Sequence, residues 1–243
     1  MQTQKAVILL GGKGTRLSGL FPDLPKALVP VAGRPFLAWQ LDWLFSRGFS
    51  TVLLAAGYMG DKIREWVRQQ SFNDRVSVSI EPEPLGTGGA LKYLAATIGK
   101  NLFLTLNGDS LLPKLDYQQM EETHRKSGAL ATIAVTSIED SGRYGAVLFD
   151  NKGKIIRFEE KKSSDAGWIN AGIYLFEPAV LSAINPNKNV SIENEVFPSL
   201  AAEGKLFVFQ AKPPLLDMGT PEGLKNMEKS IQGHPLQKSL ACQ

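Results

Sequence analysis

The stretch AVILLGGKGTRLSGLFPDLPKALVP, residues 6–30, decides the fold and points to the chemistry. Its first part, Ala6 to Leu10, is short, apolar and continuous, which is typical of a central parallel strand covered on both faces. Three glycines and three basic residues follow, namely Gly11, Gly12, Gly14, Lys13, Arg16 and Lys26. Glycines without Cβ atoms can adopt positive φ and turn backbone N–H groups toward phosphate oxygens. We therefore predict a polyphosphate site at the end of this strand.

Two better-known glycine motifs are excluded by the spacing of this loop. The dinucleotide fingerprint G-x-G-x-x-G needs a third glycine where the chain has Leu17, and a following helix that Pro22 and Pro25 would interrupt. The P-loop needs Ser or Thr directly after Gly-Lys, whereas Lys13 is followed by Gly14. We expect neither a Rossmann dehydrogenase nor a standard P-loop NTPase. The glycines alone would also fit a simple tight turn.

Apolar segments alternate with amphipathic segments through the first half of the chain. The predicted strands are residues 6–10, 51–55, 76–80 and 102–106, and the predicted helices are residues 36–47, 61–69 and 89–96. This βαβ alternation indicates an α/β fold with a doubly wound, mostly parallel, Rossmann-like sheet. Because ligands of such sheets bind outside the carboxyl ends of the strands, we expect Gly11, Glu81 and Asp109 to share one crevice.

The pattern changes in the second half of the chain. Residues 146–149 and 155–158 read as a hairpin around Asn151-Lys152-Gly153, and we expect a small antiparallel insertion to start there. Further predicted strands are 131–135, 168–176 and 207–210, and further predicted helices are 117–126, 193–203 and 221–231. Residues 1–232 are expected to form a single domain, and residues 233–243 a flexible tail.

The composition excludes several classes of protein. A hydrophobic fraction of 43% in 243 residues suits one large α/β domain. The net charge of +3 gives no support to a nucleic-acid or membrane partner. A single cysteine, Cys242, allows neither a disulfide framework nor a thiolate metal cluster, and no apolar run suits a leader or a membrane span. We expect a cytoplasmic protein, and the sequence leaves open whether it forms a homo-oligomer.

Two aspartates lie where an apolar segment gives way to a turn. Asp109 in Asn107-Gly108-Asp109 is typical of an Asx turn, although a carboxylate there also suits Mg²⁺, which combines carboxylates with phosphate oxygens and water. Asp217 precedes the last predicted helix and could cap it, but Thr220 and Pro221 already fit the N-cap and N1 positions.

The opening motif, together with later ones, resembles a known family. GGKGTRL followed by FPDLPKALVPVAGRPFLAW resembles the sugar-1-phosphate nucleotidylyltransferases, whose signature is G-x-G-T-R, then P-K-P-L or a close variant, then G-x-P. Ala27 stands where that family usually has a second proline. Tyr144-Gly145, the EEKK of residues 159–162 and Asn170-Ala171-Gly172 follow in the expected order, so the resemblance spans residues 6–227. It implies a sheet of the nucleotide-diphospho-sugar transferase type.

The resemblance also implies roles for particular residues. Arg16 and Lys26 would be catalytic, and Asp109 and Asp217 would bind Mg²⁺. The implied nucleotide-binding residues are Leu10, Gly11, Gly12, Gly14, Thr15, Arg16, Glu81, Gly86 and Thr87. The implied sugar-phosphate-binding residues are Asn107, Tyr144, Gly145, Glu160, Lys161, Asn170 and Gly172.

Glu81 is the implied contact with the edge of the base, in the glycine-bearing turn EPEPLGTGGA of residues 81–90. A carboxylate accepts hydrogen bonds but donates none. Guanine offers two adjacent donors, N1–H and N2–H₂, whereas uracil and thymine offer one donor between two acceptors. Glu81 therefore favours GTP, unless it belongs to a solvated acidic loop.

The resemblance implies condensation of an NTP with a sugar 1-phosphate to give an NDP-sugar and pyrophosphate, for surface polysaccharide or glycan biosynthesis. The acceptor phosphate is already an anionic nucleophile, so no base is needed, and His124 and His234 are assigned to solvent. The EPLGTGGAL segment and the D-x-G-T-P-E-G ending most resemble the bacterial D-glycero-α-D-manno-heptose 1-phosphate guanylyltransferases. Enzymes for mannose, glucose or N-acetylmuramate 1-phosphate share most of these motifs.

Two other classes of protein stay as alternatives. A nucleotide-sugar-dependent glycosyltransferase would normally carry D-x-D for its metal, where this chain has Asn107 in the first position. A silent NDP-sugar sensor would keep the base pocket and lose the loop arginine, a lysine or an aspartate, all of which are present.

Overall fold

A nine-stranded sheet runs through the middle of the computed structural model, which describes residues 5–138, 145–159, 166–186 and 188–231. Seven strands follow one another across it in the order β10 (Ile155–Glu159), β9 (Ala146–Phe149), β11 (Gly167–Phe176), β6 (Phe103–Asn107), β1 (Lys5–Leu10), β4 (Thr51–Ala56) and β5 (Val76–Ile80). Two more extend it from β11, because β8 (Ala131–Ile138) pairs with β11 and β12 (Leu206–Ala211) pairs with β8.

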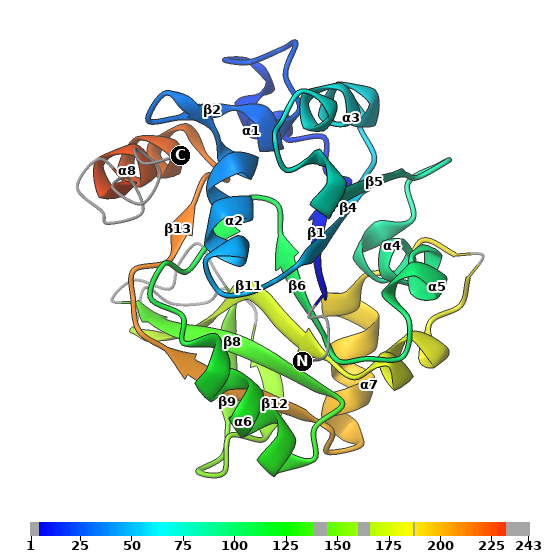
Figure 1. Cartoon of the computed structure of the whole chain (residues 1–243). Helices are drawn as coiled ribbons and strands as arrows, with labels where there is room; N and C mark the ends of the chain where they lie inside the picture. The colour runs from blue at the N-terminus through cyan, green and yellow to red at the C-terminus, as the bar shows by residue number, and fades with distance from the viewer. Residues whose placement is uncertain (1–4, 139–144, 160–165, 187, 232–243) are drawn as a thin grey trace.

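The strand β1 lies at the centre, between β4 and β6 (Figure 1), and it pairs in parallel with both. Its apolar side chains alternate between two hydrophobic clusters, with Ala6, Ile8 and Leu10 in one and Val7 and Leu9 in the other. A strand that is buried on both faces needs a continuous apolar sequence. The structure therefore confirms the predicted α/β fold with a mostly parallel central sheet.

Antiparallel pairing extends the sheet on the β11 side. The predicted hairpin is present as β9 and β10, and β11 runs antiparallel to β6, β8 and β9. The late strand β12 returns parallel to β8. Two short pairs lie outside this sheet, β2 (Pro30–Val31) with β3 (Arg34–Pro35) and β7 (Ser110–Leu111) with β13 (Leu216–Asp217).

Helices cover both faces of the sheet, as expected for a doubly wound fold. Residues of α2 (Phe36–Phe45), α3 (Gly60–Arg68), α6 (Tyr117–Ser127) and α8 (Pro221–Ile231) join one cluster. Residues of α4 (Gly86–Tyr93), α5 (Ala95–Ile98) and α7 (Phe197–Ala202) join the other. The short helical turns are α1 (Thr15–Ser18), η1 (Lys26–Leu28), η2 (Asn73–Arg75), η3 (Pro178–Ala183) and the π-helical η4 (Ile192–Val196). No helix among residues 5–138, 145–159, 166–186 and 188–231 is long and apolar enough to cross a bilayer.

Two predicted helices differ from the observed ones. The glycine-bearing turn ends earlier than predicted, since α4 already begins at Gly86 and a second short helix, α5, follows it. The N–H groups of Gly88 and Gly89 find an acceptor in the carbonyl of Val190, which gives this helix start partners that the local sequence does not show. The helix predicted over residues 193–203 is divided into η4 and α7.

The assignment of His124 to solvent is wrong. The imidazole is buried, with Nδ1 2.8 Å from Thr132 Oγ1 and Nε2 3.5 Å from Glu177 Oε1. Tyr117, Met120 and His124 share one face of α6 at helical spacing, and this face packs toward the sheet. His234 lies outside the described residues.

Candidate active site

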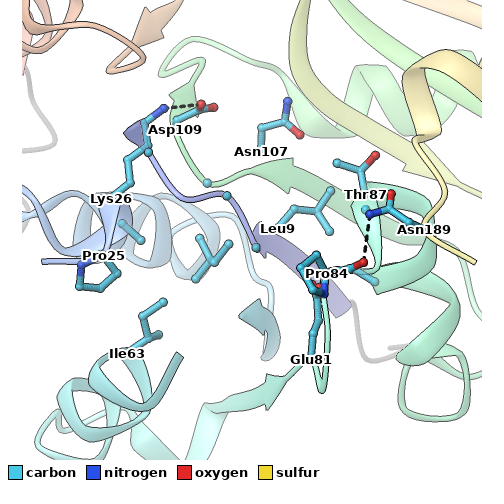
Figure 2. Close-up of a pocket in the computed structure, with 18 residues that line it drawn as sticks. Leu9, Pro25, Lys26, Ile63, Glu81, Pro84, Thr87, Asn107, Asp109 and Asn189 are labelled. Atoms are coloured by element: carbon cyan, nitrogen blue, oxygen red, sulfur yellow. Dashed lines mark hydrogen bonds and ion pairs between the residues drawn. The ribbon is translucent and has the colours of Figure 1, made fainter. Parts of the chain in front are cut away.

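A cavity of about 410 Å³ opens at the carboxyl ends of the central strands. Ten of the residues named from the sequence line it: Leu10, Gly11, Gly12, Gly14, Lys26, Glu81, Gly86, Thr87, Asn107 and Asp109. They come from the loop after β1, the segment after β5 and the turn after β6, which lie far apart in sequence (Figure 2). The expected shared crevice of Gly11, Glu81 and Asp109 is therefore present.

Lys26 and Asp109 form the ion pair of this cavity. Lys26 Nζ lies 2.7 Å from Asp109 Oδ2, and both side chains are partly exposed to the cavity (Figure 2). Gly14 adopts φ of 60°, and a Cβ atom there would come within 3.0 Å of Lys26 Cβ. The glycine loop therefore packs against the aliphatic part of the Lys26 side chain.

The turn that carries Asp109 is held from two sides. Gly108 N donates to Leu9 O at 3.0 Å, and a Cβ on Gly108 would overlap Leu9 O and Leu10 Cδ2. On the side of α2, the buried Gln40 donates from Nε2 to Asn107 O at 2.8 Å and to Ser110 O at 3.0 Å. The local sequence gave no sign of Gln40, because a single glutamine in an apolar helix has no motif.

Asp109 and Asp217 lie on neighbouring segments. Asp217 pairs in register with Ser110, and Met218 N donates to Asp109 O at 3.0 Å. Asp217 Oδ1 accepts from Gly219 N at 2.7 Å, which turns the chain toward α8. Thr220 Oγ1 accepts from Gly223 N, so Thr220 caps that helix, as expected.

Asp109 lines the cavity and Asp217 does not, although the chain segments that carry them are paired, and their proposed binding of a magnesium ion stays a prediction. Mg²⁺ takes one or two protein carboxylates and fills its other positions with phosphate oxygens and water. Within the described ranges there is no group of three or more His, Cys, Asp or Glu side chains suited to a metal.

Glu81 lies across the cavity, beside the glycine loop. A Cβ on Gly11 would lie 3.1 Å from Glu81 Oε1, so a larger residue there would press on the carboxylate and shift it. Burial raises the pKa of the Glu81 carboxyl, and the hydrogen bond from Leu85 N to Oε2, at 3.1 Å, opposes that rise. Glu81 Oε2 already has a backbone donor, and its carboxylate faces the cavity (Figure 2).

The predicted sugar-phosphate residues are described only in part. Tyr144, Glu160 and Lys161 lie outside the described residues. Gly145 is exposed, next to β9, and a Cβ there would lie 3.0 Å from Glu159 O. Asn170 and Gly172 do not line the cavity, but Gly172, with φ of 71°, lies directly against the Asn107 side chain.

Arg16 and Thr15 are also outside the cavity lining. Both belong to the short helix α1 and are exposed. Their proposed contacts with a nucleotide stay predictions.

Three residues of the site were missed from the sequence besides Gln40. Asn189 lines the cavity and donates from Nδ2 to Pro84 O at 3.0 Å. Glu193 and Tyr174 form a hydrogen-bonded connection behind Thr87. For Glu193 the sequence shows only a cluster of polar residues, Ser191, Glu193, Asn194 and Glu195, which is no motif, and the hydrogen-bond partners of Glu193 are set by the fold.

Comparisons with known proteins match nearly the whole chain to one family. Residues 5–233 match the family model described as "Nucleotidyl transferase". The chain is 38% identical over 224 residues to the mannose-1-phosphate guanylyltransferase catalytic subunit beta of Xenopus tropicalis, which covers 90% of this chain and 62% of that protein. It is 37% identical over 225 residues to a mannose-1-phosphate guanyltransferase of Aspergillus fumigatus, again covering 90% of this chain and 61% of that protein. The chain thus spans less than two thirds of these relatives.

Solved structures with the same fold include HddC from Yersinia pseudotuberculosis in complex with GMP-PN. Its TM-score is 0.84 at 31% identity, and the match covers 94% of this chain and 99% of HddC. A putative glucose-1-phosphate thymidylyltransferase from Bacillus anthracis has a TM-score of 0.82 at 23% identity, covering 95% of this chain and 96% of that chain. The second match supports the fold alone.

Proposed function

The chain belongs to the nucleotidyl transferase family, and we propose that it transfers a nucleoside monophosphate from an NTP to a sugar 1-phosphate. The observation that carries the proposal is the single cavity on which the glycine loop, Lys26, Asp109 and Glu81 converge. An anion-binding loop, a cation and a carboxylate around one space are what such a reaction requires.

The reaction balances without a protein base. An oxygen of the sugar phosphate attacks the α-phosphorus and forms the new P–O bond, while the bond from that phosphorus to the bridging oxygen breaks. The electron pair leaves with pyrophosphate. Because the nucleophile is already an anion, the protein has to align it and to stabilise the charge that builds up on the phosphates.

Residues that line the cavity and others predicted from the sequence would divide this work. The backbone N–H groups of Gly11, Gly12 and Gly14 would hold the triphosphate, and the Lys26 ammonium would balance the charge of the reacting phosphates. Asp109 and Asp217 would hold Mg²⁺, which when bound neutralises phosphate charge. Arg16 is proposed to contact the triphosphate, and Lys161 the acceptor phosphate.

GTP is the proposed nucleotide. Glu81 can accept from both guanine donors, and the two relatives compared above are named for guanylyl transfer. For the sugar, mannose 1-phosphate fits at least as well as D-glycero-α-D-manno-heptose 1-phosphate, because those relatives are named for mannose 1-phosphate. The product would be a GDP-sugar for glycan synthesis, made in the cytoplasm.

The test is release of pyrophosphate from each NTP with a panel of sugar 1-phosphates, with the product identified by mass. We expect release with GTP together with mannose or heptose 1-phosphate, loss of release on chelation with EDTA, and recovery on addition of Mg²⁺. Absence of release with every pair would overturn the proposal in favour of a sensor. Consumption of an already activated sugar would favour a glycosyltransferase instead.

A further inference from the structure

The segment 188–193 holds the loop at the start of α4. Gly88 N donates to Val190 O at 2.7 Å, and Val190 N donates to Leu85 O at 2.9 Å. Beside them, Asn189 Nδ2 donates to Pro84 O at 3.0 Å (Figure 2). The nucleotide side of the cavity is therefore fixed to a segment about 100 residues later in the chain.

Glu193 continues this connection toward the strand β11. Its Oε2 accepts from Thr87 Oγ1 at 2.8 Å and from Ser191 Oγ at 3.0 Å, and its Oε1 accepts from the Tyr174 hydroxyl at 3.3 Å. Thr87 lines the cavity, whereas Tyr174 is fully buried behind it. The Glu193 carboxylate thus contacts Thr87 at the cavity and Tyr174 in the core behind it.

The Tyr174 hydroxyl is in turn hydrogen-bonded to two asparagines. It accepts from Asn170 Nδ2 at 3.0 Å and from Asn107 Nδ2 at 3.5 Å. With these acceptor positions filled, its proton goes to Glu193. The Asn170 amide is also held by Gly172 N, which donates to Asn170 Oδ1 at 2.9 Å, so the hydroxyl matters more for the orientation of Asn107. Burial raises the pKa of Tyr174 far above its ordinary value, and the charge of Glu193 adds to this, so the hydroxyl stays a donor.

The orientation matters most at Asn107. Because Asn107 Nδ2 faces Tyr174, its carbonyl oxygen Oδ1 is left buried with no hydrogen-bond partner among the described residues. Buried polar atoms of this kind are uncommon and costly, and they often belong to functional sites. Asn107 lines the cavity, and Gly172 lies against its other side.

A role for Glu193 in capping its own helix does not account for these contacts. Ser191 caps η4 by accepting from Asn194 N at 3.2 Å, and Glu195 Oε1 accepts in return from Ser191 N at 2.9 Å. Asn194 and Glu195 are exposed, whereas Glu193 is half-buried and points inward. The cap is therefore complete with the neighbours of Glu193.

We propose that Glu193 is a positioning residue that couples the nucleotide side of the cavity to its sugar side, through Thr87 on one oxygen and Tyr174 on the other. A nucleotide that packs against Thr87 favours the arrangement in which Glu193 accepts from both Thr87 and Tyr174, and that same arrangement orients the Asn107 amide. Each substrate then strengthens binding of the other. The inference rests on the proposed function, since it needs both substrates in one site.

The coupling is measured by calorimetric titration of mannose 1-phosphate, and separately heptose 1-phosphate, in the presence of Mg²⁺. Each is added to the protein alone and to the protein saturated with α,β-methylene GTP, in which the bond to be broken cannot be cleaved. In the wild type we expect sugar phosphate to bind about 5-fold tighter or more with the analogue present.

Two variants cut the connection with little change of shape. In Glu193→Gln only one side-chain oxygen is left to accept a hydrogen bond, so Thr87 and Tyr174 cannot both donate to separate oxygens. An amide nitrogen facing Tyr174 would meet a hydroxyl that already accepts from Asn170 and Asn107. Tyr174→Phe keeps the ring packing against Phe197 and removes the hydroxyl alone. The coupling ratio is the Kd of the sugar phosphate without the analogue divided by its Kd with the analogue. In both variants we expect this ratio to fall toward 1, while the analogue alone binds within about 3-fold of wild type. The matched control Glu195→Gln, two residues along the same turn, should keep the wild-type ratio.

The outcomes separate this inference from the proposed function. If the wild type releases pyrophosphate but the ratio is 1, or if both variants keep the wild-type ratio, the coupling role of Glu193 is wrong and the proposed function stands. If the wild type binds neither substrate and releases no pyrophosphate, both fall. A loss of analogue affinity equal to the loss of sugar affinity, with the ratio unchanged, would assign Glu193 to structure alone.

Discussion

The Lys26 ammonium lies against Asp109 although the two residues come from different loops of the chain. Their side chains are 18% and 36% exposed, so water screens the pair and its contribution to stability is modest. A bound triphosphate would carry several negative charges into the same space and compete with Asp109 for the ammonium. Lys26 is thus placed to exchange one anionic partner for another as substrate enters.

Replacing Lys26 by alanine tests this at the scale of one side chain. We expect kcat/KM for GTP to fall about 10²- to 10³-fold, because a charge aimed at the reacting phosphates is lost, with little change in melting temperature. The measurement is pyrophosphate release at saturating sugar 1-phosphate. Lys205→Ala, which removes an exposed lysine paired with Glu203, serves as control. Near-normal turnover of Lys26→Ala would remove Lys26 from the mechanism.

Glu81 predicts how GTP binding depends on pH. Its raised pKa means that the carboxylate takes up a proton at a higher pH than an exposed glutamate does. Because only the charged form accepts from both guanine donors, the KM for GTP should rise as pH falls from 7 toward 5.

The variant Glu81→Gln cannot titrate, so its KM for GTP should be flat over the same pH range. At pH 7 we expect that KM to be about 10-fold higher than in the wild type, since one guanine donor then meets an amide N–H₂ group. The preference for GTP over UTP should shrink. A wild-type pH dependence that persists in Glu81→Gln would show that another group is responsible.

At the scale of elements, the sequence predicted those strands and helices whose pattern is set by burial. The continuous apolar run of β1 and the period of α8 were read correctly, because each is packed along its length. The start of α4 and the burial of His124 were not. Both depend on partners from distant segments, Val190 for the helix start and Thr132 with Glu177 for the imidazole, and no local pattern encodes them.

The turn between β6 and β7 requires glycine at position 108. In Gly108→Ala the new methyl group would overlap a backbone oxygen of β1, which cannot move without disturbing the central strand. We expect the free energy of unfolding, measured by urea denaturation at pH 7.5, to fall by about 1–3 kcal/mol.

The control for that change is Gly19→Ala. Gly19 has φ of −65° and no atom within 4 Å of the added Cβ, so its variant should stay within about 0.5 kcal/mol of wild type. Equal effects of the two substitutions would contradict the proposed overlap at Gly108.

At the scale of the whole molecule, the candidate site was predicted more fully in its members than in its connections. Sequence motifs identified Lys26, Asp109 and Asp217 as candidates. The ion pair between Lys26 and Asp109, and the position of Asp217 on a neighbouring segment, follow from how the fold brings distant loops together. Gln40 and Glu193 have no motif because their work is to hold other residues. Such supporting side chains are visible only once the fold is known.

The buried imidazole of His124 predicts how global stability depends on pH. Burial lowers its pKa below the ordinary 6.5, although Glu177 and Glu121 oppose this and Arg125 adds to it. Between the two pKa values the unfolded chain binds more protons, so stability is lost as pH falls below about 6.5. Asp42 and Glu81, with raised pKa values, act in the opposite direction at lower pH.

Comparison with His124→Gln isolates this contribution. From pH 7.5 to 5.5 the free energy of unfolding of the wild type should fall by up to about 1.4 kcal/mol more than that of the variant, as measured by urea denaturation. Parallel pH profiles of the two proteins would mean that His124 titrates alike in the folded and unfolded chain.

The amide of Gln40 spans the two ends of the turn before and after Asp109. These hydrogen bonds fix the backbone that carries the Asp109 carboxylate before any ligand binds. The loop is thus already ordered in the folded protein, so substrate binding does not bear the free-energy cost of ordering it. Mutations that rigidify the loop around Asp109 should therefore add little affinity for substrate. Removal of the Gln40 amide should lower that affinity much more.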